Sequence, residues 1–317
     1  NINISMNSNE NLISIVIPTY KGSKTLDKLS KELITVFKNY NIEIIIVNDC
    51  SPDETHEVCK SLLNEFPNNI TYIKFSKNFG EHNAVMAGLR HSEGDLIIIM
   101  DDDYQNVPEE ALKLTEYSLN NDFDVVFTRY AKKEDSFLRN LMSKFANFTA
   151  KVILKKPKEI YFSSFKSVKK KLLREIIKYE GPFPYIDGLI LSETQNIGSL
   201  DVNHAKRKVG KSSYNLRKLA KHYLNLATNF STIPIHFFSI IGVIIILISI
   251  IMIISVIIEK MLNPNIPQGY SQLITVILFF SGVQILFLGV IGEYVGKILK
   301  NVNKEKQYNI SYLKKKD

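Results

Sequence analysis

The sequence predicts an α/β domain with a mostly parallel sheet, followed by a C-terminal transmembrane helical hairpin. In the first half of the chain, short runs rich in Ile and Val alternate with segments of helical periodicity. Strands this apolar are buried on both faces, as in parallel sheets. Near the C-terminus, residues 237–258 contain no charge, and residues 273–291 contain only Gln284 as a strongly polar residue. Each stretch approaches the roughly 20 residues that a helix needs to cross a membrane.

The predicted elements alternate along the chain. Strands are expected over 13–17, 43–48, 71–75, 95–100 and 125–128, and helices over 24–40, from about 53, over 81–91 and over 109–119. Farther on, helices are expected over 137–154 and 167–179, and a late strand over 199–203. Ligands of open α/β sheets bind outside the carboxyl ends of the strands. The site is therefore expected in the loops after Ile17, Asn48, Phe75 and Met100.

Charge and cysteine content narrow the class of protein. The formal net charge of the 317 residues is +8, which suits an anionic partner such as a lipid surface or a phosphorylated ligand. Cys50 and Cys59 are the only cysteines and show no paired spacing, so neither a disulfide framework nor a zinc site is expected. The basic residues gather beside the apolar stretches rather than among aromatic side chains, so nucleic-acid binding is not expected either.

The chain is expected to divide into five parts. These are a disordered N-terminus without a signal-peptide pattern (1–12), the α/β domain (13–213), a juxtamembrane amphipathic helix (214–232), two transmembrane helices (233–298, at about 237–258 and 273–291) and a basic cytoplasmic tail (299–317). Both outer flanks of the apolar stretches are basic, so the positive-inside rule places both termini in the cytoplasm. An inner or plasma membrane protein with a cytoplasmic α/β domain is the resulting prediction.

Three consecutive carboxylates, Asp101, Asp102 and Asp103, follow the apolar strand predicted over 95–100. Alternate residues of an extended segment point the same way, so Asp101 and Asp103 can approach one cation together. A small number of hard oxygen ligands suits Mg²⁺ or Mn²⁺ that also binds substrate phosphates. A solvated acidic turn with a helix N-cap is the alternative, and the triplet alone does not decide between the two.

Two further polar turns follow predicted strands. Asp49, at the end of one strand, can accept a hydrogen bond from a nucleotide base or a ribose hydroxyl, while Asp53 is expected to cap the next helix. In the turn 76–80, Lys77 or Asn78 is expected to face a ligand. The loop after the first strand is not G-x-G-x-x-G, which argues against a dinucleotide oxidoreductase.

Together these motifs resemble glycosyltransferase family two, whose members are inverting enzymes with the GT-A fold, a Rossmann-like α/β domain. Residues 15–20 are similar to the family's opening strand and nucleotide loop, and residues 48–51 stand where the family usually shows Asp-Asp-Gly-Ser. Residues 101–103 resemble its metal-binding D-x-D motif. The resemblance covers residues 13 to about 230.

Further segments resemble the polyprenyl-phosphate branch of that family, which includes enzymes like dolichol-phosphate-mannose synthase. These segments are Asn78-Phe79-Gly80 with the small residues that follow it, 101–105 with Pro108 and Glu109, 204–214, and 292–296 at the end of the second apolar stretch. The sequence departs from the family at Asn48 and Cys50, which replace Asp and Gly. Lys166 and Asp187 stand where the branch often has Arg and a basic residue.

The resemblance implies inverting transfer of a sugar from a UDP- or GDP-sugar to a polyprenyl phosphate such as undecaprenyl phosphate, in cell-envelope glycan synthesis. Asp101 and Asp103 would hold Mg²⁺ or Mn²⁺. The donor nucleotide sugar is expected at Pro18, Tyr20, Asp49, Lys77, Asp101, Asp102 and Gln105. Catalytic side chains are expected at Asp101, Asp103, Arg129, Arg207 and Lys211. Acceptor or phosphate contacts are expected at Arg139, Lys166, His204, Ser212 and Tyr214, and Asp187 is the candidate base if the acceptor is a hydroxyl.

Two other functions stay open at this point. One is transfer to a hydroxyl of a lipid-linked saccharide or glycolipid, which would use the same motifs. The other is a nucleotide-sensing component of a membrane channel or flippase. The three consecutive carboxylates argue against it, because sensing a nucleotide does not require a metal ion bound to its diphosphate. Gly282 and Gly289 lie seven residues apart on one helical face near Gln284, which predicts close helix packing and a homo-oligomer, with a tetramer as one form.

Overall fold

The computed structural model describes residues 11–130, 163–203 and 269–316, together with isolated positions between 240 and 262. The chain divides into two compact units. The first unit joins Asn1–Ser213 to Lys304–Asp317, so it contains the chain on both sides of the second unit, Tyr214–Asn303.

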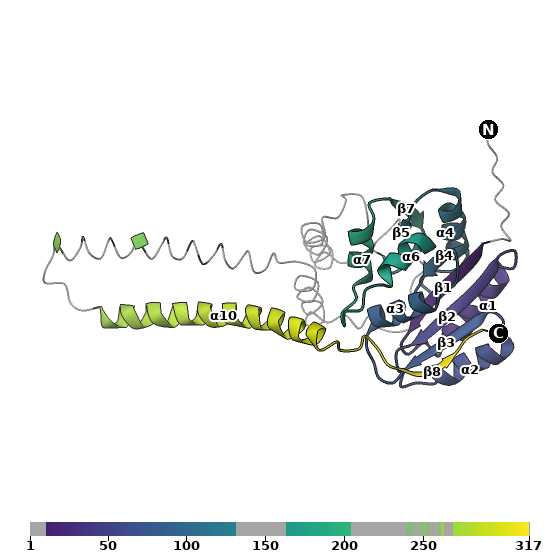
Figure 1. Cartoon of the computed structure of the whole chain (residues 1–317), viewed down its shortest axis with the longest axis horizontal. Helices are drawn as coiled ribbons and strands as arrows, with labels where there is room; N and C mark the ends of the chain where they lie inside the picture. Colours follow the sequence, from purple (N-terminus) through teal and green to yellow (C-terminus); the bar gives the residue numbers. More distant parts are fainter. Residues whose placement is uncertain are drawn as a thin grey trace. The chain divides into compact units, whose positions relative to one another are not determined.

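The first unit is built on an eight-stranded sheet with the order β7-β5-β6-β4-β1-β2-β3-β8 (Figure 1). The strands are β1 (Leu12–Thr19), β2 (Asn41–Asn48), β3 (Ile70–Phe75), β4 (Leu96–Ile99), β5 (Val125–Tyr130), β6 (Lys166–Lys169), β7 (Ile197–Val202) and β8 (Ile310–Lys314). Strands β4, β1, β2 and β3 are mutually parallel, as are β5 and β7. Strands β6 and β8 run antiparallel to their neighbours. The sheet is therefore mixed, and the expectation of a mostly parallel sheet holds only for its centre and for the β5–β7 pair.

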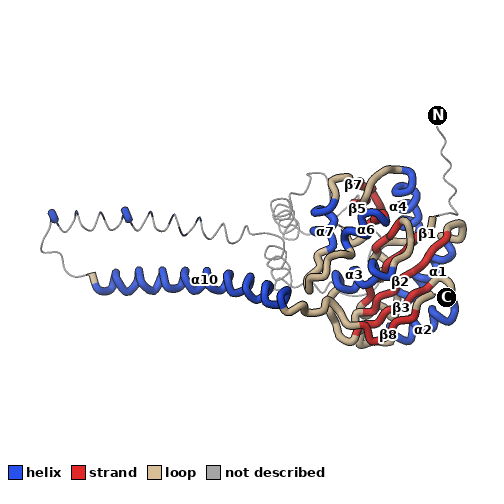
Figure 2. The backbone as a smooth tube through the Cα atoms, viewed as in Figure 1, coloured by secondary structure: helices blue, strands red, loops and turns tan. Residues whose placement is uncertain are grey.

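Helices cover both faces of this sheet, as Figure 2 shows. They are α1 (Leu26–Val36), α2 (Thr55–Glu65), α3 (Glu81–His91), α4 (Pro108–Asn120), α6 (Lys170–Ile176) and α7 (Ile186–Glu193). Helices α1, α2 and α4 pack on one face through one apolar core, and α3, α6 and α7 pack on the other face through a second core. The α/β fold predicted from the alternating pattern is confirmed, with helices packed on both faces of the sheet.

The two-sided burial of β1 follows from its sequence. Ile15 and Ile17 point into the core under α1, while Val16, between them, points into the core under α3. This alternation is the period of two expected for an extended chain. Helix α3 approaches β1 closely at Gly88, where an added Cβ would collide with the side chain of Val16. The small residues of α3 thus set the distance between helix and sheet.

Two parts of the first unit differ from the sequence-based expectation. The segment predicted as one helix over 167–179 begins as β6, which pairs with β4 and β5, and becomes helical only at Lys170. Helix α7 and strand β8 were not predicted at all. Part of the expected basic tail, Ile310–Lys314, is the edge strand of the sheet, antiparallel to β3. The helix predicted over 137–154 lies outside the described residues.

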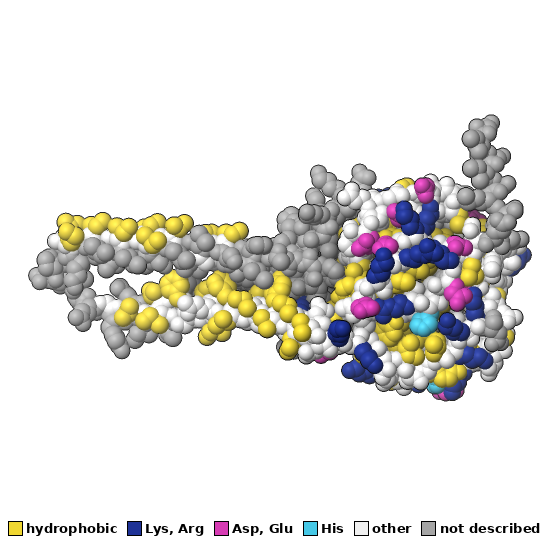
Figure 3. Space-filling model, viewed as in Figure 1, with side chains coloured by type: hydrophobic (Ala, Val, Ile, Leu, Met, Phe, Trp, Pro, Cys, Tyr) yellow, Lys and Arg dark blue, Asp and Glu magenta, His cyan; other side chains and the backbone are white. Residues whose placement is uncertain are grey.

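Within the second unit, the structure describes one long helix, α10 (Tyr270–Val302). It contains the second predicted span, and its part Phe280–Val302 is long and apolar enough to cross a membrane by length and composition. Apolar side chains are exposed along this unit in Figure 3. The exposed apolar residues of α10 include Leu273, Ile285, Leu288, Ile291 and Ile298. The first predicted span, 237–258, falls largely outside the described residues, so the predicted hairpin is supported here by one of its two helices.

Candidate active site at the carboxyl ends of the strands

The carboxyl ends of β1, β2 and β4 lie next to each other in the sheet and bring the predicted polar turns together. Thr19 at the end of β1 is level with Asn48 at the end of β2, and the amide of Asp49 donates to the carbonyl of Thr19 over 3.0 Å. The Thr19 hydroxyl donates to Asp102, which follows β4. Gly22 lies against this contact, and a Cβ there would collide with both partners. The first and fourth loops are therefore joined at the acidic triplet.

A second hydroxyl serves the first carboxylate of the triplet. The Ser164 Oγ donates to Asp101 Oδ2 over 2.5 Å. Asp103 accepts from the backbone amide of Gln105 over 3.1 Å. Glu81, at the exposed start of α3, adds a further negative charge that acts on Asp101. Four carboxylates from α3 and the turn after β4 thus lie within electrostatic reach of one another.

Loss of water, together with repulsion between neighbouring carboxylates, raises two pKa values. The pKa of Asp101 rises to about 7, chiefly because the surrounding protein removes water from it, and next because Glu81 repels its negative charge. The pKa of Asp102 also rises to about 7, again chiefly through loss of water, and the Thr19 hydroxyl opposes the change. A raised carboxyl pKa means that the ionised form is disfavoured in this environment. A cation bound beside these carboxylates would lower both values.

The residues fit a divalent ion shared with a substrate phosphate. No group of three Asp, Glu, His or Cys side chains suited to hold a metal alone occurs among the residues that the structure describes. Mg²⁺ bound with substrate phosphates typically uses one or two protein carboxylates and takes its other ligands from phosphate and water. Asp101 and Asp103, with Asp102 beside them, supply that smaller set, and a bound cation would offset the loss of water that disfavours the ionised forms of Asp101 and Asp102.

Asp49 holds the loop that follows β3. Its two carboxylate oxygens accept the backbone amides of Phe79 and Gly80 over 2.6 and 2.8 Å. Gly80 has a φ of 96°, a backbone conformation that side chains disfavour. Burial raises the pKa of Asp49, and these two amides oppose the rise. The residue predicted to contact the nucleotide directly therefore also orders the turn 76–80 beside it.

The remaining predicted donor residues line the same edge of the sheet. Pro18 lies within β1, and Tyr20, which follows that strand, is exposed. Lys77 is exposed in the turn after β3, with its Nζ 5.0 Å from the centre of the Phe79 ring. Gln105 lies in the turn that carries the acidic triplet. These positions meet the expectation that loops after β1, β3 and β4 share one region, while nucleotide contact itself stays a prediction.

Three predicted residues are engaged in ion pairs. Lys166, on β6, forms a buried pair with Asp187 on α7. Arg129 forms a two-pronged contact with Asp201, at 2.6 and 2.9 Å, on the surface between β5 and β7. The structure thus gives Asp187, the candidate base, a buried cationic partner. Six other predicted residues lie outside the described part of the chain, namely Arg139, His204, Arg207, Lys211, Ser212 and Tyr214.

Sequence reasoning missed three residues of this site. Thr19 and Ser164 are the hydroxyl partners of Asp102 and Asp101, and Glu81 adds charge beside them. Thr19 and Glu81 carried a signal, because each is adjacent to a strand end or turn already expected at the site. Ser164 carried no such signal. It lies 63 residues from Asp101 along the chain, and no local pattern indicates that the two side chains meet in space.

Comparison with known proteins shows the family of the chain. Residues 14–177 match the model of Glycosyl transferase family 2. The chain is 29% identical to an undecaprenyl-phosphate 4-deoxy-4-formamido-L-arabinose transferase of Edwardsiella ictaluri, over 94% of this chain and 93% of that one. It is 30% identical to the protein of the same name from Yersinia enterocolitica, over 94% of this chain and 92% of that one. The similarity spans both units of the chain.

Solved structures share the fold. A mycobacterial protein matches with a TM-score of 0.52 at 16% identity, over 69% of this chain and 73% of that one. Glucosyl-3-phosphoglycerate synthase from Mycobacterium tuberculosis, in complex with Mn²⁺, UDP and glucosyl-3-phosphoglycerate, matches with a TM-score of 0.50 at 15% identity, over 69% and 78%. The shared fold is GT-A. The chain belongs to glycosyl transferase family 2 and is a glycosyltransferase of its polyprenyl-phosphate branch.

Proposed function

We propose that this protein transfers a sugar, with inversion, from a nucleotide-sugar donor to a polyprenyl phosphate such as undecaprenyl phosphate at the cytoplasmic face of a membrane. Two of the relatives that match nearly the whole chain are named as undecaprenyl-phosphate 4-deoxy-4-formamido-L-arabinose transferases, which supports the acceptor. The nucleotide-sugar donor is supported by one observation above all. Asp101, Asp102 and Glu81 lie close together beside the loops proposed to bind the nucleotide, and the pKa values of Asp101 and Asp102 are about 7.

The reaction requires above all that the negative charge of the departing nucleotide diphosphate be stabilised. Mg²⁺ or Mn²⁺, held by Asp101 and Asp103, would act as a Lewis acid on the two phosphates of the leaving nucleotide. Ser164 and Thr19 hold Asp101 and Asp102 in place through hydrogen bonds, so the carboxylates are positioned before substrate binds. Cationic contacts to phosphate are proposed for Arg129, Arg139, Arg207 and Lys211.

The acceptor determines whether a general base is needed. A phosphate monoester has a second pKa of roughly 6, so a lipid phosphate is largely ionised at neutral pH and attacks without losing a proton. Asp187 is occupied by Lys166 in a buried ion pair, which fits an acceptor that needs no base. Transfer to a sugar hydroxyl would require Asp187 or another group to take a proton. The geometry therefore supports lipid phosphate over a hydroxyl acceptor.

The membrane assignment supports the same acceptor. Helix α10 exposes apolar side chains and contains a stretch able to cross a bilayer by length and composition. We propose an integral protein of the inner or plasma membrane with its first unit in the cytoplasm, where nucleotide sugars are supplied. Exposed Gly282 and Gly289 on α10 support close helix contact in a homo-oligomer, because both leave open space around their Cα atoms.

The alternative of a non-catalytic nucleotide sensor is not retained, because the chain is a glycosyltransferase by family. Transfer to a lipid-linked saccharide is the remaining alternative. It shares the donor site, so only the acceptor separates it from the proposed reaction.

The decisive experiment offers the purified full-length protein a panel of UDP- and GDP-sugars with Mg²⁺ or Mn²⁺. The acceptors are undecaprenyl phosphate, undecaprenol and an undecaprenyl-diphosphate-linked saccharide, and lipid mass spectrometry reads the products. We expect a sugar joined to undecaprenyl phosphate and none on undecaprenol, with inverted anomeric configuration by NMR. Product formed on the lipid-linked saccharide alone would contradict the proposed acceptor, and retained configuration would contradict the mechanism.

A further inference from the structure

The chain returns to the first unit after α10 and runs along the open edge of β3. Strand β8 pairs antiparallel with β3, from Tyr72 opposite Lys314 to Phe75 opposite Ile310. The pairing continues beyond the strand, because the amide of Ser76 donates to the carbonyl of Asn309 over 2.9 Å. We call residues 307–316 the C-terminal strap. The strap therefore reaches the first residue of the turn 76–80, which Asp49 holds from its other end.

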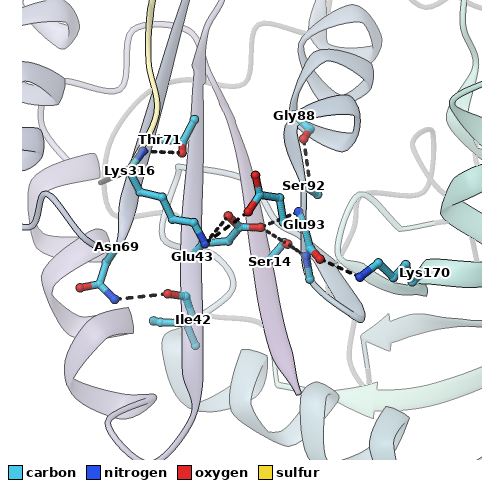
Figure 4. A network of polar contacts seen from close by, with 11 residues as sticks. Ser14, Ile42, Glu43, Asn69, Thr71, Gly88, Ser92, Glu93, Lys170 and Lys316 are labelled. Atoms are coloured by element: carbon cyan, nitrogen blue, oxygen red, sulfur yellow. Dashed lines mark hydrogen bonds and ion pairs between the residues drawn. The ribbon is translucent and has the colours of Figure 1, made fainter. Parts of the chain in front are cut away.

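Both ends of the strap are fixed by polar contacts. At its start, the Gln307 amide donates to the carbonyls of Tyr179 and Gly181 over 3.0 and 2.6 Å. At its end, Lys316 Nζ lies 3.0 Å from Glu43 Oε2, inside the network drawn in Figure 4. Glu43 is 1% exposed, so Lys316 supplies charge compensation for a carboxylate with little access to water. The strap is thus a docked segment with a defined register.

One aromatic contact leads from the strap to the nucleotide loops. The Tyr308 ring stacks on Phe75, with the ring centres 5.0 Å apart and the planes 10° from parallel. Phe75 contacts the Phe79 ring edge-on at 5.6 Å. The guanidinium of Arg90 lies 5.7 Å from the centre of the Tyr308 ring. Because the Phe79 amide is bound to Asp49, Tyr308 is linked through Phe75 to the turn that Asp49 orders.

A second contact leads from the strap to the turn after β2. Tyr312 packs on Tyr72, with ring centres 5.6 Å apart. The Tyr72 hydroxyl accepts the Asn48 side-chain amide over 3.0 Å, and Asn48 Oδ1 accepts the backbone amide of Ser51 over 2.8 Å. Asn48 directly precedes Asp49. The strap therefore supports both turns that bear on Asp49.

We propose that the C-terminal strap is a positioning element for the donor nucleotide, acting through Tyr308 and Tyr312 on the turns 76–80 and 48–51. This inference rests on the proposed function, because it assigns those turns to the donor site. Loops held in their binding conformation before the ligand arrives lose less entropy on binding. The strap contacts Phe75 and Tyr72, which lead to the two turns beside Asp49, and it is not proposed to contact substrate. Its residues are therefore positioning residues and not catalytic ones.

The test compares Tyr308→Ala with Tyr308→Phe, which keeps the stacked ring, and with Leu313→Ala, whose side chain is exposed on the same strand. Hydrogen exchange of peptides covering Phe79 and Gly80 is measured on the full-length protein in detergent. UDP and GDP are titrated separately with MnCl₂ by calorimetry. We expect Tyr308→Ala to speed exchange at these amides and to weaken binding of the nucleotide that the wild type binds by about tenfold. Tyr308→Phe and Leu313→Ala are expected to match the wild type in both measurements.

Distinct outcomes overturn the two proposals. Exchange at Phe79 and Gly80 that is unchanged in Tyr308→Ala contradicts the positioning role, whatever the nucleotide affinity. A wild type that binds neither nucleotide contradicts the donor assignment of the proposed function and the strap's donor role with it. If Tyr308→Ala fails to fold, Tyr308→Leu keeps the apolar volume without the stacked ring, and the same two measurements apply. An equal loss of binding in Leu313→Ala would show a general effect of the strand and would also contradict the role of Tyr308.

Discussion

At the residue scale, the ionisation of Asp101 and Asp102 depends on their hydroxyl partners and on their surroundings. Ser164 and Thr19 each donate to one aspartate of the triplet, and these hydrogen bonds favour the ionised forms. The pKa values of Asp101 and Asp102 nevertheless rise to about 7, so loss of water and mutual repulsion outweigh the hydroxyls. A bound cation would offset both effects and favour the ionised forms.

Removing a proposed metal ligand should abolish transfer without unfolding the protein. We expect Asp101→Asn and Asp103→Asn each to lower turnover about a hundredfold or more, the scale of losing a main electrostatic stabiliser. Turnover is measured with saturating Mn²⁺, and folding by thermal unfolding. Asp95→Asn is the matched control, because Asp95 is an exposed acid at the opposite end of β4 from the triplet and pairs with Lys170. Near-normal turnover of both variants in EDTA would rule out the metal site.

The stability of the metal-free protein should fall as the pH rises from about 4 to about 7. The folded-state pKa of about 7 for Asp101 and Asp102 lies above their ordinary value of 3.8, so the folded protein keeps protons that the unfolded chain has released. Stability from these two groups is therefore full below pH 4 and is lost as the pH passes 7. Melting temperatures in EDTA should show this slope in the wild type and a flatter one in Asp101→Asn/Asp102→Asn. Equal slopes would contradict the assignment.

Breaking the Lys166–Asp187 pair should cost far more than replacing it. Their side chains are 5% and 11% exposed, so Lys166→Met leaves an uncompensated buried carboxylate, and we expect a loss of about 3–5 kcal/mol. Lys166→Met/Asp187→Leu should recover most of that stability. Thermal unfolding measures both. A double variant as unstable as the single one would show that Lys166 stabilises the fold through groups other than Asp187.

At the scale of elements, the two antiparallel strands of the sheet, β6 and β8, could not be predicted from the sequence pattern. Strand β6 has only four residues, Lys166–Lys169, and its sequence passes into α6 without a turn signal. The helical periodicity of the segment therefore led to the prediction of one continuous helix. Strand β8 covers the β3 edge that would otherwise present unpaired amides and carbonyls. Both strands are defined by their partners rather than by their own propensity.

Docking of β8 should depend on the contact between Lys316 and Glu43. Lys316→Ala leaves Glu43 without its cation, and because Lys316 is 20% exposed we expect a loss of about 1–3 kcal/mol, below the full penalty for a buried pair. That loss corresponds to a lower melting temperature by roughly 2–4 °C per kcal/mol. Lys315→Ala, at the exposed neighbouring position, is the control. Equal melting temperatures for the two variants would show that backbone pairing alone docks the strand.

At the scale of the whole molecule, the position of the first unit relative to the membrane decides its access to nucleotide sugar. The basic flanks predict that both termini are cytoplasmic and that the start of α10 lies on the opposite side. In intact cells, Ser271→Cys should react with an impermeant thiol reagent and Lys306→Cys should not. Lys306 is exposed, so a lack of reaction there reports sidedness rather than burial.

The topology experiment has an internal control. Permeabilised cells should label Lys306→Cys, and the parent chain, whose cysteines are Cys50 and Cys59, sets the background in both conditions. Labelling of Lys306→Cys in intact cells, with Ser271→Cys unlabelled, would reverse the topology. A first unit outside the cytoplasm would then be cut off from the donor that the proposed function requires.

The sequence by itself determined the features that depend on local pattern. The short apolar runs rich in Ile and Val located β1, β2, β3 and β4 to within a few residues, and their alternation with helical segments predicted the α/β fold. The rule that ligands meet strand ends placed the acidic triplet beside Asp49 and the turn 76–80. The long apolar run located α10. Each of these follows from residues close together along the chain.

Only the tertiary structure decided which distant side chains meet. Ser164 lies 63 residues from Asp101, and Lys166 lies 21 residues from Asp187, yet each pair is in contact. Tyr308 stacks on Phe75 from beyond the apolar helix. These contacts arise because the sheet aligns strands that are remote in sequence, and no local period encodes such an encounter. The charge, geometry and pKa values of the site therefore belong to the folded chain, while the residues available to build it can be read from the sequence.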